Sequence, residues 1–329
     1  MQTQHDSSKP SDASVPVVVG VDVSKATLDC YFDPVGRWLH VTNDADGIAK
    51  LITQLRTLKI QLVVLEATGR LHRRLAGELL LAGIPVALVN PQRAREFARA
   101  SGRLEKTDRV DARVLAEFGR GVKHRTLEKL PEKQADLDDL ISRRRALVQM
   151  HIAEKNRLHD QLPKLARTQG QKLLRLIDQQ IEDLDKAVAE LIDGDDDWMR
   201  KSQIITSVPG VSDGTANQLI ADLPELGTLS RQSIAKLAGV APLAADSGSH
   251  RGQRHIKGGR GPVRNALYMA AFNAMRCCER FKHMAQRLRN AGKPFKVVVT
   301  ACMRKLLVTL NQMVKTDSTY NASLNVSVA

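Results

Sequence analysis

The sequence has few cysteines, and none of them stands in a metal-binding pattern. The four are Cys30, Cys277, Cys278 and Cys302 in a chain of 329 residues. No pair has the C-x-x-C spacing, and the adjacent Cys277 and Cys278 are poorly arranged for a zinc site. This pattern argues against a zinc module and favours reduced thiols in a cytosolic protein.

Long apolar segments are also missing. The opening residues, MQTQHDSSKPSDAS, are polar and contain no apolar core of a secretory signal. No uninterrupted apolar run reaches about 18 residues, the length that a membrane-spanning helix needs. We therefore expect a soluble protein with no membrane partner, located in the cytoplasm and associated with the nucleoid.

Acidic residues are outnumbered by basic ones. Against 36 Asp and Glu the chain has 50 Lys and Arg, which gives a net charge of +14 and a pI near 9.8. Its apolar content of 43% is ordinary, so the chain is not a basic disordered tail, and its length suggests two domains. The positive charge favours a polyanionic partner, with nucleic acid the leading candidate and a merely basic surface the alternative.

The first part of the chain predicts an α/β domain over residues 15–125, preceded by a polar tail at 1–14. Three segments rich in β-branched and aromatic residues, VPVVVGVDVS, TLDCYFD and RWLHVTN, predict antiparallel strands. GIAKLITQLRTL and RLHRRLAGELLLAG have helical spacing, and they alternate with the short apolar strands QLVVLEATG and PVALVN. This order predicts a mixed sheet with interleaved helices.

A long charged helical linker is predicted over residues 126–199. Six apolar residues in it step by three and four, which is the pattern of a coiled coil: Leu174, Ile177, Ile181, Leu184, Val188 and Leu191. Pro163 and Gly170 are expected to break the segment into two helices. An antiparallel pair within the chain and a coiled coil between subunits fit equally well. Residues 200–318 predict a mainly α-helical domain, and residues 319–329 a loose tail.

Four acidic residues lie within or at the ends of predicted strands and helices, at positions that suggest a function for the charge. Asp22 lies inside the apolar strand segment VVVGVDVSK, where burial is unfavourable unless the carboxylate is paired or binds an ion. Glu66 ends the strand in VVLEATG, and strand ends are where open α/β sheets carry their sites. Asp108 and Asp111 are three apart at the start of the helical segment in KTDRVDARVLAEF, so they share one face.

These four carboxylates predict a metal site. If they converged, they would repel one another unless cations neutralised them. Oxygen ligands suit hard ions such as Mg²⁺, and two such ions can stabilise the entering and leaving oxygens of phosphodiester displacement. We therefore expect Asp22, Glu66, Asp108 and Asp111 to bind Mg²⁺. The alternative for any single acid is a helix cap or a surface charge; for Asp108 alone the two interpretations are equally good, whereas Asp22 inside a strand is harder to explain in this way.

A loop rich in glycine and arginine lies at residues 247–261. Glycine lets the backbone approach a phosphate and arginine forks onto its oxygens, so the loop is a candidate nucleic-acid clamp. Five basic residues are the candidates for phosphate contact: Arg251, Arg254, Lys257, Arg260 and Arg264. A flexible basic surface loop is the alternative. Ser247 and Ser249 lie in the same loop, but spacing alone does not distinguish a nucleophile from a turn serine.

A second candidate for phosphate contact lies upstream of that loop. ITSVPGVSDGTANQLI resembles a helix-hairpin-helix, in which a Pro-Gly turn aims backbone N–H groups at DNA phosphate. Ser212 stands where such a hairpin usually has its second glycine. This departure leaves a packed helical turn as the alternative.

Taken with these residues, the motifs carry a family resemblance. GVDVSK, LEATG and KTDRVDARVLAEF resemble the N-terminal RuvC-like (RNase H-like) domain of the insertion-sequence transposase family 110/1111, which includes the Piv DNA invertases. The resemblance continues through the coiled-coil linker into the C-terminal transposase domain, where ADSGSHRG looks like the serine-bearing motif of the family. It implies a catalytic tetrad of Asp22, Glu66, Asp108 and Asp111 with Mg²⁺, and Ser247 as the nucleophile.

The resemblance implies a DNA transposase that cleaves and rejoins donor and target DNA through a phosphoserine intermediate. It also implies a noncoding guide (bridge) RNA and homodimers that assemble into a tetramer. Two other classes stay open: a RuvC-like structure-selective endonuclease that uses water, and a nonenzymatic nucleic-acid-binding protein descended from a transposase. A sugar-kinase-like interpretation of GVDVSK is weak, because no further phosphate-binding glycine motif follows it.

Overall fold

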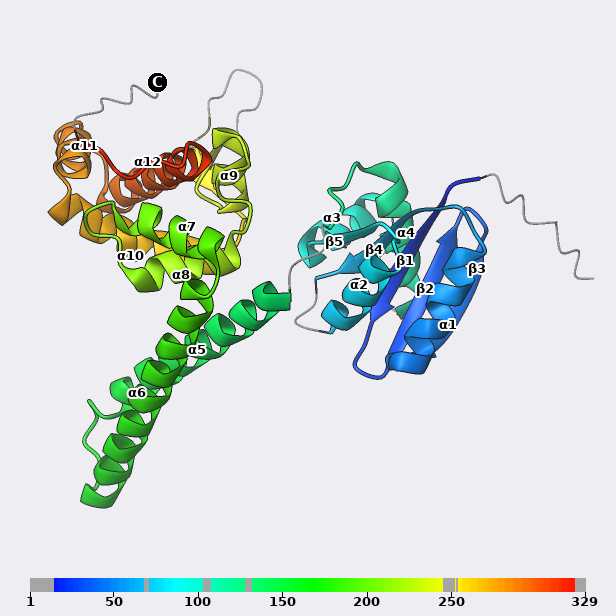
Figure 1. The fold of residues 1–329 in the computed structure, drawn as a ribbon, viewed down its shortest axis with the longest axis horizontal. Helices are drawn as coiled ribbons and strands as arrows, with labels where there is room; N and C mark the ends of the chain where they lie inside the picture. The colour runs from blue at the N-terminus through cyan, green and yellow to red at the C-terminus, as the bar shows by residue number, and fades with distance from the viewer. Residues whose placement is uncertain are drawn as a thin grey trace, which may run out of the picture. The chain divides into compact units, whose positions relative to one another are not determined.

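The chain folds into two compact units, Met1–Leu130 and Pro131–Ala329, in the computed structural model. Figure 1 shows the first unit as a sheet with helices and the second as helices almost throughout. This confirms the predicted mixed α/β sheet and the helical C-terminal region. The structure describes residues 15–67, 71–102, 108–127, 132–244, 252 and 254–322, except for the side chains of residues 108, 109 and 132.

A five-stranded sheet with the order β3-β2-β1-β4-β5 is the frame of the first unit. Its strands are β1 (Val17–Val23), β2 (Thr27–Asp33), β3 (Arg37–Thr42), β4 (Ile60–Glu66) and β5 (Val86–Val89). β2 pairs antiparallel with both β1 and β3, whereas β4 runs parallel to both β1 and β5. The three leading segments are therefore antiparallel strands, as predicted, and β1 joins the antiparallel half of the sheet to the parallel half.

Helices cover both faces of this sheet, which is why the central strands are mostly apolar, apart from Asp22 in β1 and Gln61 and Glu66 in β4. The helices of the first unit are α1 (Ala45–Arg56), α2 (His72–Leu81), α3 (Pro91–Ala100) and α4 (Asp108–Gly121). In Figure 1, α1 and α2 lie in front of the sheet and α4 behind it. Val19 and Val21 belong to the core under α1 and α2, whereas Val18 and Val64 belong to the core under α3 and α4. Alternate residues of a strand thus point to opposite faces.

The charged linker is a helical hairpin that belongs to the second unit. α5 (Glu132–Arg157) and α6 (Lys164–Asp193) run antiparallel, because Arg144 forms an ion pair with Asp185 and His151 Nε2 lies 3.2 Å from Asp178 Oδ1. Apolar residues near the start of α5 and the end of α6 join the C-terminal core: Leu137, Ile141, Val188 and Ile192. The apolar stripe of α6 is thus used inside the chain, which was one of the two arrangements predicted for it.

Gly170 does not break the helix, contrary to prediction. It lies inside α6, and Pro163 alone marks where that helix begins. A Cβ at Gly170 would lie 2.7 Å from Leu158 Cδ2 and 2.9 Å from Glu154 Oε1. Gly170 thus leaves room for the ends of the Leu158 and Glu154 side chains to pack against α6, and it does not serve a turn.

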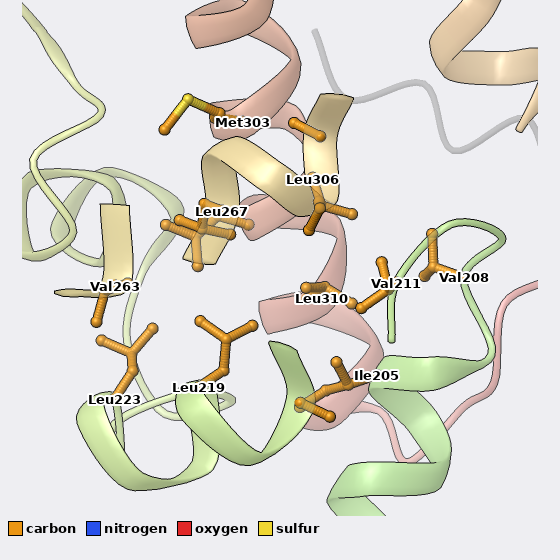
Figure 2. Packing of buried hydrophobic residues seen from close by; sticks show 14 of the residues in the cluster. Ile205, Val208, Val211, Leu219, Leu223, Val263, Leu267, Met303, Leu306 and Leu310 are labelled. Carbon is orange, nitrogen blue, oxygen red and sulfur yellow. The ribbon is translucent and has the colours of Figure 1, made fainter. Parts of the chain in front are cut away.

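The C-terminal domain is a bundle around one apolar core. Its elements are α7 (Asp196–Thr206), α8 (Asp213–Asp222), α9 (Arg231–Leu237), β6 (Pro242–Leu243), β7 (His255–Ile256), α10 (Gly261–Cys277), α11 (Glu279–Asn290) and α12 (Phe295–Lys315). Figure 2 shows Leu219 of α8, Leu267 of α10, and Leu306 and Leu310 of α12 converging in this core. Fully removing side chains of this size from water stabilises the fold by about 1.5–3 kcal/mol each.

α12 is the one described helix that is long and apolar enough to cross a membrane. Half of its most apolar window is buried inside the domain. Leu306, Leu307 and Leu310 are fully buried, whereas Arg304 is exposed. This pattern is that of a core helix with one solvent-facing side.

Candidate functional site

Asp22 and Glu66 are neighbours on the central pair of strands. Val21 of β1 is opposite Leu65 of β4 in the parallel register, and Asp22 and Glu66 are the next residues of these strands. Each follows by two positions a residue that packs toward α4, so both side chains point to the α4 face. Adjacent strands are about 4.8 Å apart, so the two half-buried carboxylates are close.

Asp111 reaches the same face because α4 packs antiparallel on β1. Gly119, late in α4, lies against the beginning of β1, whereas Ala112, early in α4, lies against Gly20. The first turn of α4 therefore reaches the level of Asp22, further along β1. The structure brings three of the four predicted acids to one face at the carboxyl ends of β1 and β4.

Asp108 is the first residue of α4, and its side chain lies outside the described residues. Its position three residues before Asp111 puts the two on one helix face. Among the side chains that the structure describes, no three of the types His, Cys, Asp and Glu lie close enough together to hold a metal ion. The donor set is carboxylate oxygen throughout, which fits a hard divalent ion, and binding by the four acids stays a prediction.

Another carboxylate, Asp29, lies opposite Asp22 and was not among the predicted site residues. The two are register partners in the antiparallel β1–β2 pair, so their side chains share one face. Asp29 Oδ1 lies 2.8 Å from Nδ1 of His40 on β3. Because like charges directly opposite one another are unfavourable, the imidazole gives Asp29 a partner of its own. The signal that could have found Asp29 is the alternation within TLDCYFD.

The part of α4 that follows the acids is basic on its exposed side. Arg113 lies 5.6 Å from the centre of the Tyr31 ring and donates to Glu117 across 3.0 Å. This hydrogen bond to Glu117 raises the pKa of the Arg113 guanidinium above its usual value. One turn beyond Glu117, Arg120 donates to Asp33 across 3.0 Å. Fixed positive charge thus lies on the helix that carries Asp111.

A short antiparallel hairpin frames the predicted serine loop in the second unit. β6 pairs with β7, with Pro242 opposite Ile256 and Leu243 opposite His255. The predicted nucleophile Ser247 lies in the connection between these strands, outside the described residues. The same holds for its neighbour Ser249 and for Arg251. The structure therefore fixes where the loop begins and ends.

Three of the predicted phosphate contacts that follow Ser247 in the chain carry positive charge near the surface: Arg254, Lys257 and Arg264. Arg254 and Lys257 are exposed. Arg264, in the first turn of α10, is half-buried, and its Nη1 donates to the carbonyl oxygen of Gly258 across 2.6 Å. These residues remain candidates for nucleic-acid contact.

Arg260 has a different environment from the one expected. Its Nη1 and Nη2 donate to the two carboxylate oxygens of Glu225 across 2.6 and 2.8 Å, and Nη1 also donates to the carbonyl oxygen of Asp222. This bidentate pair ties the end of the glycine-rich loop to the segment after α8. The geometry favours a structural role for Arg260 over the predicted phosphate contact.

The turn between α7 and α8 packs against α10. Gly210 has a φ of +92°, and a Cβ there would lie 2.7 Å from the backbone nitrogen of Ala274. Ser212 has a φ of −92° and is the N-cap residue of α8, so its backbone conformation does not require glycine. The structure therefore matches the packed helical turn that was the alternative to a phosphate-binding hairpin.

Two family models match the chain over the regions just described. A transposase model for the DEDD domain of IS110 elements matches residues 19–166, and one for the transposase IS116/IS110/IS902 family matches residues 202–286. The chain belongs to the IS110/IS1111 family of transposases. It is therefore a DNA transposase. The first matched region contains the four acids, which lie on β1, β4 and α4, and the second contains the loop with Ser247.

Relatives of this transposase align over most of its length. The pilin gene-inverting proteins of Moraxella bovis and Moraxella lacunata are each 24% identical over 318 residues, covering 93% of this chain and 98% of theirs. The transposase for insertion sequence element IS1111A of Coxiella burnetii is 22% identical over 269 residues, covering 70% of each chain. A structure of T. thermophilus RuvC in complex with Holliday junction substrate covers 34% of this chain and 100% of that one, with 15% identity and a TM-score of 0.26.

Proposed function

We propose that Asp22, Glu66, Asp108 and Asp111 form the metal site of a RuvC-like nuclease domain, with Mg²⁺ as its ion. The observation that carries this proposal is the adjacency of Asp22 and Glu66 on β1 and β4, with the first turn of α4 at the same level. When bound, Mg²⁺ would polarise the scissile phosphate and stabilise the entering and leaving oxygens. The four carboxylates would hold the ion at the face where the three elements meet.

Ser247 is the proposed nucleophile of the transposase. Its Oγ attacks the phosphorus of a phosphodiester, loses its proton to solvent, and forms a phosphoserine ester. The bond from phosphorus to one deoxyribose oxygen breaks, and that oxygen takes up a proton as it leaves. In the rejoining step a deoxyribose hydroxyl of another strand attacks the phosphorus of the phosphoserine and loses its proton to solvent. The bond from phosphorus to Oγ of Ser247 breaks, and Oγ takes up a proton as it leaves. The position of Ser247 within the second matched region, 202–286, supports this role.

We assign nucleic-acid binding to basic residues that follow Ser247 in the chain. DNA is the partner that a transposase requires, and we propose Arg254, Lys257 and Arg264 as phosphate contacts, together with Arg251. The net charge of +14 is also consistent with a noncoding guide RNA. Arg260 is left out of the contact set because Glu225 already occupies its guanidinium. The transposase would act on DNA in the cytoplasm, at the nucleoid.

The proposed assembly is a homodimer that pairs into a tetramer. The acids lie in the first unit and the serine in the second, so a complete site needs a first unit and a second unit. Recombination also needs several strands to be cut together. Leu165 and Leu176 of α6 are 70% and 55% exposed in the single chain. Such apolar side chains on a helical hairpin favour a contact with a second copy.

A trapped protein–DNA adduct tests the proposed chemistry. On a nicked suicide substrate with Mg²⁺, the wild-type transposase should give a covalent species on a denaturing gel. Ser247→Ala should give none, while Ser249→Ala, a matched change two residues away, should retain it. Cleavage by Ser247→Ala at the wild-type rate would instead favour the endonuclease that uses water, and an adduct in that variant would move the nucleophile elsewhere.

A further inference from the structure

A groove with a volume of about 1070 Å³ lies in the C-terminal domain, beside the hairpin that frames the serine loop. Its walls come from α9, the β6–β7 hairpin, α10, α11 and α12, all within the second unit. The volume exceeds the roughly 300–1,000 Å³ of typical small-molecule pockets. A groove of this size has room for a stretch of polymer.

The side chains around the groove carry charge of one sign. Six of them are basic: Arg231, Arg254, Arg264, Lys296, Arg304 and Lys305. Within the described part of the chain no Asp or Glu lines the groove, and Lys296, Arg304 and Lys305 form no ion pair there. Partial burial, and secondarily the charge of Arg280, lowers the pKa of Lys305 below its ordinary value. Concentrated positive charge of this kind attracts a polyanion.

Apolar side chains lie among these cations. Tyr268 of α10, Ile256 of β7 and Val297 of α12 are 40%, 36% and 49% exposed, and all three line the groove. Bases in a duplex are stacked and offer no free faces to such side chains, whereas unpaired bases do. Basic grooves with aromatic side chains that stack on bases are typical of single-strand binding.

We propose that this groove binds an unpaired segment of the DNA strand that adjoins the phosphodiester cut by the transposase. The cations would contact the phosphates, while Tyr268 and its apolar neighbours would contact the bases. Two of the lining residues, Pro242 and Arg254, lie on either side of Ser247 in the chain, so the groove adjoins the loop that carries the proposed nucleophile. The choice of DNA over RNA rests on the proposed function. In that function Ser247 attacks a DNA strand, so the strand next to Ser247 is DNA.

The proposed role of the groove is tested by measuring oligonucleotide binding under conditions in which the DNA is not cleaved. The full chain carrying Ser247→Ala would be titrated in EDTA with a labelled single-stranded DNA oligonucleotide and with a duplex of the same sequence, over a salt series. Lys296→Glu/Arg304→Glu alters exposed residues of the groove, and Arg287→Glu/Lys315→Glu is the matched control on exposed residues that do not line it.

We expect the groove pair to weaken single-strand binding at least tenfold and the control pair to change it by less than about twofold. The slope of log affinity against log salt should fall by about 1.4, since each phosphate contact to a single strand contributes about 0.7. Equal losses in both pairs would show only a general effect of net charge and would overturn the groove. Circular dichroism and thermal melting of each variant separate loss of binding from loss of fold.

Tyr268 tests the base contact. Tyr268→Ala should weaken single-strand binding roughly tenfold and leave duplex binding within about twofold, while Tyr268→Phe should keep the affinity because the ring remains. An equal loss for single strand and duplex would contradict binding of unpaired bases. A loss confined to a single-stranded RNA of the same sequence would assign the groove to RNA and overturn the proposal.

The adduct assay keeps this proposal separate from the proposed function. If the wild-type chain forms no adduct while the groove variants still lose single-strand affinity, the serine chemistry fails and strand binding by the groove stands. If adducts form and the groove variants bind like the control pair, the groove fails and the serine chemistry stands.

Discussion

Gly20 of β1 lies so close to Ala112 of α4 that a Cβ at Gly20 would overlap the carbonyl oxygen of Ala112. The same Cβ would lie 2.9 Å from the Cβ of Leu115. This contact lets α4 lie directly on the central strand, and it holds the first turn of α4 beside the end of β1. The close packing of α4, the helix of Asp111, on β1, the strand of Asp22, therefore depends on a glycine at position 20.

Gly20→Ala should destabilise the first unit by about 1–3 kcal/mol, because the added methyl group forces α4 away from β1. The same displacement should reduce DNA cleavage more than DNA binding. Chemical denaturation and a cleavage assay at a temperature where the variant is folded measure the two effects. Gly77→Ala is the control, since nothing lies near that exposed helix position, and it should raise stability by about 0.5–1 kcal/mol. Equal stability of both variants would contradict the close contact.

Asp22→Asn should abolish metal-dependent cleavage and leave nucleic-acid binding within about threefold, because the amide removes one anionic ligand while the basic surface is unchanged. Glu66→Gln and Asp111→Asn should behave alike, and EDTA should reproduce the loss with the wild-type chain. Cleavage is followed on gels and binding by fluorescence anisotropy. Wild-type cleavage rates in Asp22→Asn would remove this residue from the site.

Arg260→Ala should destabilise the C-terminal domain by about 1–3 kcal/mol, because it removes a bidentate pair and leaves the largely buried Glu225 without that partner. Lys257→Ala, at an exposed position in the same loop, should change stability by less than about 0.5 kcal/mol and weaken nucleic-acid binding instead. Thermal melting and salt-dependent binding of both variants distinguish the roles. Unchanged stability in Arg260→Ala would restore it as a candidate phosphate contact.

Asp108→Ala mixed with Ser247→Ala should recover part of the cleavage activity that each variant lacks alone. If the proposed site combines the acids of one subunit with the serine of another, a mixed assembly would pair intact acids with an intact serine and rebuild one such site. Strand cleavage is measured in the mixture after subunit exchange and compared with each variant by itself. No recovery, with mixed oligomers shown to form, would mean that each site is built within one chain.

The strand context of Asp22 and Glu66 could be predicted from the sequence, because a carboxylate within or at the end of an apolar strand stands out against its neighbours. The helix face shared by Asp108 and Asp111 could also be predicted, since helical spacing is a local property. The first three antiparallel strands and the apolar stripe of α6 could be predicted for the same reason, because each follows from residues that are close together in the sequence.

Contacts between distant segments could not be predicted in this way. Asp29 faces Asp22 only because β1 and β2 pair in one register, and a shift by one residue would turn it to the other face. Arg260 binds Glu225, which is 35 positions away in the sequence. The prediction that Arg260 contacts phosphate came from the composition of its loop and could not take this carboxylate into account. The groove depends on α9 and α12, which no local pattern links to the serine loop.

The sequence by itself thus determined the net positive charge and the candidates for the chemistry, which are the four acids and the serine. Only the tertiary structure decided which segments lie side by side, because strand register, the close approach of α4 at Gly20 and the packing of α12 beside the hairpin depend on side chains far apart in the chain.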